Sequence, residues 1–237
     1  MTAEVQIDAF VAEHNLTIPP PAKINLGAFM CTSGELRVTD PCYSSDVWCA
    51  GTLKNVKEGM WVASTREQVD WLDWQGTARF GLQEIGMYEG ASFSVIEMKR
   101  TNLATAMRNM RGRVYYLYVV HVDHVTESRF AADNIFDTLF KNGSTVDFDV
   151  GVDSGQAGFF DANDYPEDGG EDEAFYETCC RQTLDHNAGI VERFGRNMGA
   201  VSSTGWGDGS YDCHYVTDDQ GQVIAAGILY IVDPEEE

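Results

Sequence analysis

Two segments of the chain place short polar side chains beside glycines, a pattern typical of loops that hold a ligand. The first covers residues 150–161 and carries Asp153 and Ser154 next to Gly155. The second covers residues 201–215 and has three glycines within five residues. Glycine adopts positive φ and lets a backbone approach a ligand closely. We therefore expect the two segments to meet in space and frame a common recess.

The candidate residues in these segments divide by chemistry. Carboxylates, a hydroxyl and an imidazole could share a proton, and the catalytic candidates are Asp153, Ser154, Asp208, Asp212 and His214. Backbone groups, hydroxyls, an amide and an indole could hold a ligand, and the binding candidates are Gly155, Gln156, Thr204, Trp206, Gly207 and Ser210. Calcium and magnesium prefer oxygen ligands, so Asp208 and Asp212 are the metal candidates. The expected cofactor is no more specific than a divalent cation.

Three functions fit these residues. A non-enzymatic binding protein is favoured, because no complete catalytic set stands out and Ser154 lacks the Gly-x-Ser-x-Gly context of a hydrolase nucleophile. The first alternative is a metal-assisted hydrolase, in which Asp153, Asp208, Asp212 and His214 surround an ion that lowers the pKa of bound water. The second alternative is a calcium-stabilised structural protein.

Negative charge is concentrated in the C-terminal part of the chain. The 237 residues carry 38 acidic and 16 basic side chains, for a formal charge of −22. Residues 142–237 hold 21 of the acids and 3 of the bases, a net charge of −18. Such a field repels phosphate, which disfavours nucleic acid as a partner. We expect a protein partner or a small ligand, and an acidic surface of this kind could occupy a basic surface of that partner.

Composition also bears on the compartment. No apolar run approaches the roughly 20 residues needed to cross a bilayer, which disfavours a membrane protein. The first residues lack the basic and apolar stretches of a signal peptide. The six cysteines form no CxxC pair, and most of them are expected to be small buried hydrophobic residues. These features favour a cytoplasmic protein.

Local sequence patterns predict the elements that position the two segments. Apolar residues at helical spacing predict helices over 5–14 and 102–111. Acidic residues at 171–173 and Arg181 near the other end predict a helix over 171–184. A further short helix is expected to begin at Ser44 or Ser45, which could cap it, and to run through Cys49. Alternating patterns predict strands over 35–39, 60–64 and 91–98. The runs 114–122 and 222–232 are apolar on both faces, which predicts two central strands covered on both sides.

The remaining patterns concern the turn at Trp206, a His–Asp pair and the tryptophans. Asp208-Gly209 is a strong turn dipeptide, so a hairpin tip is expected between strands at 200–204 and 211–217. His121 and Asp123 fall on one face of the predicted central strand, where a structural pair is favoured over an acid–base pair. Three tryptophans close in sequence are expected to anchor a core rather than a partner surface, namely Trp61, Trp71 and Trp74.

Taken together, these elements predict an α+β fold. We expect a mostly antiparallel twisted sheet with a few short helices packed on it. The chain is expected to form a single domain over residues 1–237, and the alternative is a division into 1–141 and 142–237, where the charge balance changes.

Several longer motifs resemble a family of uncharacterised proteins found in bacteria and tailed phages. They occur in the same order in that family, and they are GELRVTDPCY at 34–43, WC at 48–49, GMW at 59–61, RVYYLYVVH at 113–121, VDSGQAGFFD at 152–161 and STGWGDGSYD at 203–212. The resemblance covers roughly residues 34–232 and is weaker between 64 and 98. It implies a cytoplasmic protein of bacterial or phage origin. With that origin, the favoured binding protein could be a phage accessory or anti-defence factor. It lends no activity, substrate, cofactor or catalytic residue.

Overall fold

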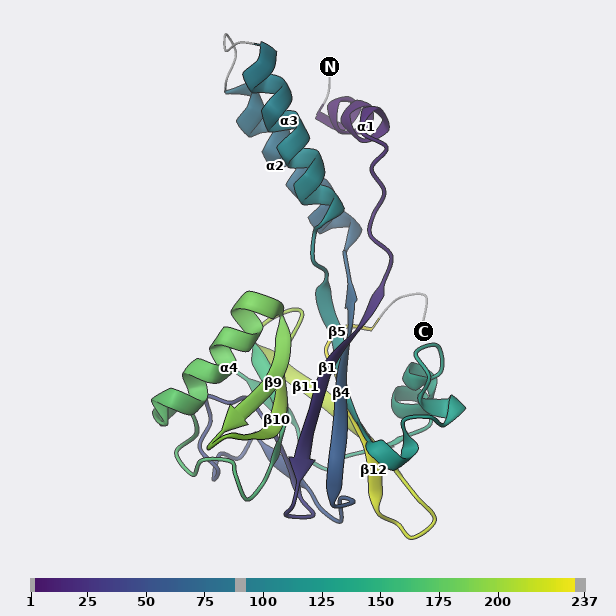
Figure 1. The fold of residues 1–237 in the computed structure, drawn as a ribbon, viewed down its shortest axis with the longest axis vertical. Helices are drawn as coiled ribbons and strands as arrows, with labels where there is room; N and C mark the ends of the chain where they lie inside the picture. The colour runs from purple at the N-terminus through teal and green to yellow at the C-terminus, as the bar shows by residue number, and fades with distance from the viewer. Residues whose placement is uncertain (1–2, 88–92, 233–237) are drawn as a thin grey trace. The chain divides into compact units, whose positions relative to one another are not determined.

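The structure is a computed structural model, and its described part comprises residues 3–87 and 93–232. Contacts between Cα atoms divide the chain into two compact units (Figure 1). One is formed by Met1–Ala22 and Gln68–Gly112, and the other by Lys23–Glu67 and Arg113–Glu237. The chain passes from one unit to the other after residues 22, 67 and 112, and none of these points is the alternative boundary expected between 141 and 142.

The first unit is helical. Its helices are α1 (Ala3–Glu13), α2 (Trp71–Gly86) and α3 (Phe93–Arg108). Phe10 of α1, Trp74 of α2 and Met107 of α3 share a small apolar core, because each helix turns one apolar stripe toward the others. The helices predicted over 5–14 and 102–111 are therefore confirmed in their main part.

The strand predicted over 91–98 is wrong for residues 93–98, which form the first turns of α3. Residues 91 and 92 lie outside the described part. A short alternation of apolar side chains does not distinguish a strand from a helix. Here the packing of α3 against α2 decides the outcome.

The second unit contains two sheets. The larger sheet has seven strands, in the order β1 (Ala22–Cys31), β4 (Gly59–Gln68), β5 (Arg113–His121), β12 (Val223–Leu229), β11 (Gly209–Thr217) and β6 (Ser144–Thr145), with β7 (Val150–Val152) paired to the other end of β11. The smaller sheet has the order β3 (Gly51–Leu53), β2 (Leu36–Thr39), β8 (Gln156–Asp161), β10 (Arg196–Ser203) and β9 (Ala188–Arg193). The strand pairs β2–β8, β8–β10, β11–β7 and β11–β12, which position the candidate site described below, are all antiparallel.

The core of this unit lies between the two sheets. Leu117 of β5 and Ile228 of β12 belong to the larger sheet, and they share one apolar cluster with Val38, Phe159 and Ala200 of the smaller sheet. The two central strands are confirmed, because β5 lies between β4 and β12 and its side chains are buried from residue 114 to residue 121. The predicted α+β class with mostly antiparallel strands is confirmed, and the strands are divided between two sheets.

Helices and short turns cover the outer faces. Helix α4 (Glu173–His186) confirms the helix predicted over 171–184 and lies beside β9 and β10 (Figure 1). It begins at Asp172, whose carboxylate accepts a hydrogen bond from the amide of Phe175. Shorter pieces are the 3-10 turns η1 (Val122–His124), η2 (Ser128–Phe130) and η4 (Gly169–Glu171), and the π turn η3 (Asp137–Lys141).

The short helix predicted from Ser44 through Cys49 is wrong, because residues 41–50 form turns. The two serines that could begin such a helix are engaged elsewhere. The hydroxyl of Ser44 donates to Asp46, and the amide of Ser45 donates to the carbonyl of Glu167. These bonds hold the segment as an irregular loop.

Two groups of residues were expected in the core. Trp61 and Trp74 are buried as predicted, and the side chain of Trp71 lies outside the described part. All six cysteines are free thiols. Three of them are buried and three are partly exposed, so the prediction that most are buried holds for half.

Candidate functional site

The two glycine-rich segments lie side by side. Strand β7 of the first pairs antiparallel with the start of β11 in the second, so that Gly151 faces Ser210 and Val152 faces Gly209. A second contact follows, because the amide of Thr204 donates to the carbonyl of Gly155 over 3.1 Å. The expected meeting of the segments is therefore present.

The hairpin predicted at Trp206 is absent in this part of the chain. Strand β10 ends at Ser203 in the smaller sheet, whereas β11 begins at Gly209 in the larger sheet. The residues between them cross from one sheet to the other. Gly205 makes this crossing possible, because its φ is +64° and a Cβ there would lie 2.5 Å from the carbonyl oxygen of Val114.

A buried carboxylate holds the first segment in place. Asp40 is fully buried, and its carboxylate accepts hydrogen bonds from the amides of Cys42, Asp153 and Ser154 over 2.8, 2.9 and 2.7 Å. The hydroxyl of Ser154 donates a fourth bond to it over 2.6 Å. A buried carboxylate needs such donors, since an unpaired one would be strongly destabilising. Asp40 is thus the anchor of the 153–155 turn.

A recess opens beside this turn. It is lined by Tyr43, Val47, Trp48, Cys49, Asp149, Gly151, Val152, Asp153, Gly209 and Ser210, and its volume is about 530 Å³. We refer to it below as the Trp48 recess. The 41–50 loop forms one wall and is joined to β7, because the amide of Gly151 donates to the carbonyl of Cys49 over 2.8 Å. The charged residues of its lining are both acidic, so the recess has a negative potential.

Trp48 gives the recess its most unusual feature. Its side chain is 88% exposed, the highest value among the large apolar residues of the described part. Tyr43 lies in the same lining, and burial together with hydrogen bonds to Asp153 and Cys49 raises the pKa of its hydroxyl. The phenol is protonated at neutral pH and can act as a hydrogen-bond donor.

Only two of the sequence-predicted residues line this recess, namely Asp153 and Ser210. Ser154 and Gln156 are not part of its lining. The amide of Gln156 reaches the Ser154 hydroxyl and the Cys180 sulfur over 3.5 Å each, and its oxygen accepts from the Thr183 hydroxyl. These bonds are structural, because they join β8 to helix α4.

The ligand-binding candidates of the second segment mostly stabilise the crossing. The hydroxyls of Thr204 and Tyr211 both donate to the carbonyl of Gly207, over 2.6 and 2.7 Å. Trp206 is 60% exposed and packs its ring under the guanidinium of Arg113, 4.4 Å from the ring centroid. Gly155 and Gly207 adopt positive φ, at +69° and +94°. Their conformations fit the turns that bring the segments together.

The proposed hydrolase cluster is not assembled. His214 lies on the outer face of the larger sheet, where its ring contacts Phe140 and its Nδ1 lies 3.4 Å from the Thr145 hydroxyl. Burial lowers the pKa of His214, so it is neutral at pH 7. Asp208 and Asp212 are exposed. Within residues 3–87 and 93–232, no group of three His, Cys, Asp or Glu side chains could hold a metal ion.

His121 and Asp123 form a structural arrangement. The Nδ1 of His121 accepts from the amide of Asp123 over 3.3 Å, so its Nε2 carries the proton and donates to the carbonyl of Glu58 over 3.1 Å. Both ring nitrogens are thus bonded to backbone. The carboxylate of Asp123 lies 3.6 Å from the same Nδ1 and pairs with Lys57 over 3.2 Å.

Sequence reasoning missed most of the recess. Tyr43 and Trp48 come from a loop whose local sequence is typical of a turn and a short helix, and Asp149 precedes the glycine-rich segment at 150–161. The available signal was the motif at 34–43, which ends in Asp40, Cys42 and Tyr43. Its role depends on contacts with residues more than 100 positions away.

No protein-family model, curated protein or solved structure matches the chain. The resemblance to bacterial and phage proteins therefore stays a prediction from its motifs. In the described residues, every helix is too short or too polar to cross a bilayer.

Proposed function

We propose that this chain is a non-enzymatic binding protein that holds a basic segment of a protein partner in the Trp48 recess. The observation that carries the proposal is the combination of a highly exposed indole with two carboxylates in one concave lining. A lysine or arginine side chain suits both features, because its charge pairs with the carboxylates and its cationic group packs on the ring.

The energetics favour a recognition role for Trp48. An indole left in water forgoes the stabilisation that burial of its large apolar area would give, on the order of a few kcal/mol. The two core tryptophans, Trp61 and Trp74, obtain that stabilisation, whereas Trp48 does not. Tryptophan is also among the residues that dominate binding energy in protein interfaces.

Charge supports the same kind of partner. Residues 142–237 carry a net charge of −18, and they contribute Asp149 and Asp153 to the lining of the recess. A field of this sign attracts a basic surface from a distance and raises the association rate, more strongly at low ionic strength. The binding is therefore expected to weaken as salt increases.

A hydrolytic function has less support. Asp153 belongs to the recess, whereas His214 contacts Phe140 on the outer face of the larger sheet. The hydroxyl of Ser154 donates to Asp40 rather than to a histidine. The residues of the alternative thus lack a shared reacting centre, and no observation favours a calcium-stabilised structural role.

The compartment and the origin belong to the proposal as well. Six free thiols suit a reducing environment, and we place the protein in the cytoplasm on that ground. A role as a phage accessory or anti-defence factor is an extension of the motif resemblance.

A peptide titration tests the proposed function. A fluorescein-labelled nonapeptide of arginine and glycine is titrated at 50 mM and 300 mM salt, with anisotropy as the readout. We expect Trp48→Ala to weaken binding about tenfold, which corresponds to about 1.4 kcal/mol. The matched control is Trp206→Ala, since Trp206 is exposed outside this lining.

Two results would contradict the proposal. The first is that the unaltered protein does not bind the peptide at either salt concentration. The second is that Trp48→Ala and Trp206→Ala bind as tightly as the unaltered protein, because attraction to the general acidic surface would then explain the binding without the recess.

A further inference from the structure

An apolar groove runs along the seam between helices α2 and α3 of the first unit, between residues 73–85 and 99–110. We refer to it as the hairpin groove. Its two hollows measure about 590 and 270 Å³, and they share Gly81, Glu84 and Leu103. The helices run antiparallel, because the hydroxyl of Thr77, near the start of α2, lies 3.8 Å from the sulfur of Met110, which follows the end of α3.

The hairpin groove faces away from the core of the first unit. Trp74, Ala78 and Met107 share that core with α1, and none of them lines the groove. The side chain of Phe80 lines it and is 72% exposed. An exposed apolar face of this kind marks an interaction surface.

The shape of the groove face suits a second copy of the same face. Phe80 projects from α2, whereas Gly76, one turn earlier, has no atom within 4 Å of the position that a Cβ would take. On the α3 side, Ala106 is small and exposed. Because one surface carries both a projection and the space to receive it, two copies related by a two-fold axis could each place Phe80 in the other's groove.

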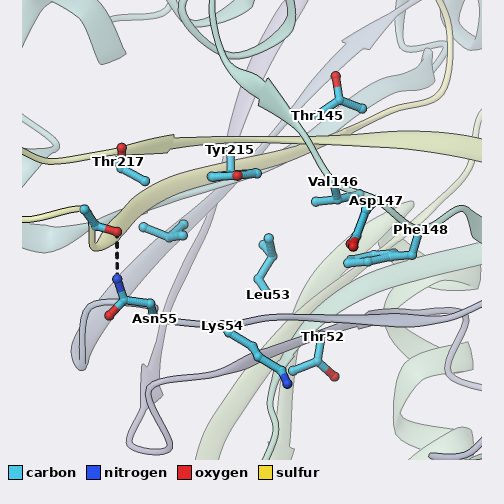
Figure 2. Close-up of a pocket in the computed structure, with 12 residues that line it drawn as sticks. Thr52, Leu53, Lys54, Asn55, Thr145, Val146, Asp147, Phe148, Tyr215 and Thr217 are labelled. Carbon is cyan, nitrogen blue, oxygen red and sulfur yellow. Dashed lines mark hydrogen bonds between the residues drawn. The ribbon is translucent and has the colours of Figure 1, made fainter.

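The hollow between the two sheets of the second unit differs in this respect (Figure 2). Its volume is about 650 Å³, but its apolar lining residues Leu53 and Val223 are 5% and 3% exposed. The ammonium group of Lys54 is directed away from the facing wall (Figure 2). None of the exposed large apolar residues of the described chain lines this hollow, so it presents no apolar projection that another molecule could receive.

Charge favours association through the first unit. Its segments Met1–Ala22 and Gln68–Gly112 carry 8 acids and 5 bases, a net charge of −3. The segments of the second unit carry 30 acids and 11 bases, a net charge of −19. Like charges repel, so two copies meet the least repulsion where their first units approach each other.

The charges along the groove select one orientation. Glu84 of α2 and Lys99 of α3 line the same hollow and therefore lie at the same level of the hairpin. A two-fold axis parallel to the helices sets α2 of one copy on α3 of the other, which brings Glu84 opposite Lys99. An axis across the helices would instead bring Glu84 close to Asp73 of the other copy, which is unfavourable.

We propose that the hairpin groove is the interface of a homodimer, in which two α2–α3 hairpins form an antiparallel four-helix bundle. Phe80 of each copy packs against Ala106 of the other, and Glu84 pairs with Lys99 of the other. Helix pairs commonly bury their apolar faces in bundles of this kind. This inference does not depend on the Trp48 recess.

Sedimentation velocity of the full chain, up to about 200 μM, tests the inference. We expect the mass to rise with concentration toward twice the chain mass of 26.3 kDa. Phe80→Ser and Gly76→Lys should each weaken association at least tenfold. The matched controls are Met98→Ser and Gly86→Lys, which alter an exposed methionine and an open helix glycine outside the groove. Lysine forms helices better than glycine, so Gly76→Lys should lose the dimer with no loss of helix signal in circular dichroism.

A charge exchange tests the orientation. Glu84→Lys and Lys99→Glu should each weaken self-association at least tenfold, because each opposes two like charges in the dimer. An equimolar mixture of the two variants should associate as tightly as the unaltered protein, since opposite charges then face each other at both contacts. A chain that stays monomeric at every concentration would overturn the inference and leave the groove to a helix of another protein. Unchanged association of Phe80→Ser, or a mixture no tighter than either variant alone, would overturn it as well.

Discussion

Removal of the charge from Asp40 is the sharpest perturbation of the recess. The substitution Asp40→Asn keeps the size of the side chain and replaces one carboxylate oxygen by an NH₂ group. One oxygen accepts from the Cys42 amide and the Ser154 hydroxyl, and the other accepts from the amides of Asp153 and Ser154. The new NH₂ group is tolerated best on the Ser154 hydroxyl side, because a hydroxyl can rotate and accept.

The expected cost follows from this geometry. The Cys42 amide would lose its acceptor, and a buried unsatisfied donor costs about 1–3 kcal/mol. The two remaining amide bonds would no longer be charge-assisted and would each weaken by about 1 kcal/mol. Relief from burying a charge offsets part of the loss. We expect the free energy of unfolding to fall by about 2–4 kcal/mol.

Urea unfolding followed by circular dichroism measures this change, and hydrogen exchange localises it. The amides of residues 42, 153 and 154 should lose protection first. The control is Asp46→Asn, because Asp46 is exposed and accepts a hydrogen bond from the nearby Ser44. The anchoring role of Asp40 is refuted if the free energies of unfolding of Asp40→Asn and the unaltered protein differ by less than about 0.5 kcal/mol and these amides stay protected.

Further predictions concern a glycine pair, a histidine, a thiol and metal. Gly205→Ala should destabilise the chain by more than about 2 kcal/mol in urea unfolding and Gly207→Ala by about 1 kcal/mol, because both have positive φ but only Gly205 faces a carbonyl; equal losses would contradict the crossing geometry. Burial lowers the pKa of His121, so its contribution to stability is complete above about pH 6.5 and is lost as pH falls through the lower folded-state pKa. In denaturant melts, the free energy of unfolding of His121→Gln should therefore fall less between pH 7 and pH 5 than that of the unaltered protein. An equal fall in both proteins would contradict a lowered pKa for His121. Burial beside Asp40 raises the pKa of the Cys42 thiol to about 12, so mass spectrometry should find slow alkylation at pH 8 in the folded chain and fast alkylation in urea. Calcium and a chelator should both leave the melting temperature unchanged, and a rise with calcium would revive the metal hypothesis.

Elements with strong local patterns were predictable from the sequence. The runs that form β5 and β12 are apolar on both faces. Only a strand covered on both sides needs this pattern, so the runs themselves indicated a central position in the sheet. Helix α4 was predictable because acidic residues stand at its start and Arg181 lies toward its other end, and both charges suit the helix dipole. Local sequence carried this information.

Other elements were decided by distant contacts. The turn at Trp206 resembles a hairpin tip, yet β10 pairs with β8 and β9, and β11 pairs with β12. The loop at 41–50 resembles a helix start, yet Ser45 bonds to Glu167. Pairing partners far along the chain cannot be read from a short window of residues.

The candidate site was predictable only where it depends on local sequence. The glycines correctly indicated that the two segments approach each other, because positive φ and a small side chain are local requirements. The recess itself needed Trp48 and Tyr43, which reach it only because Asp40 ties their loop to residues 153 and 154. No local pattern marks that tie.

Hydrogen–deuterium exchange of the full chain, with and without a saturating arginine-rich peptide, tests the central claim most directly. We expect the peptide to slow exchange at residues 43–49, 149–153 and 209–210, and we expect Trp48→Ala to abolish this slowing. Slowing confined to other acidic segments, with no change at these three, would show that a basic partner is held elsewhere on the molecule.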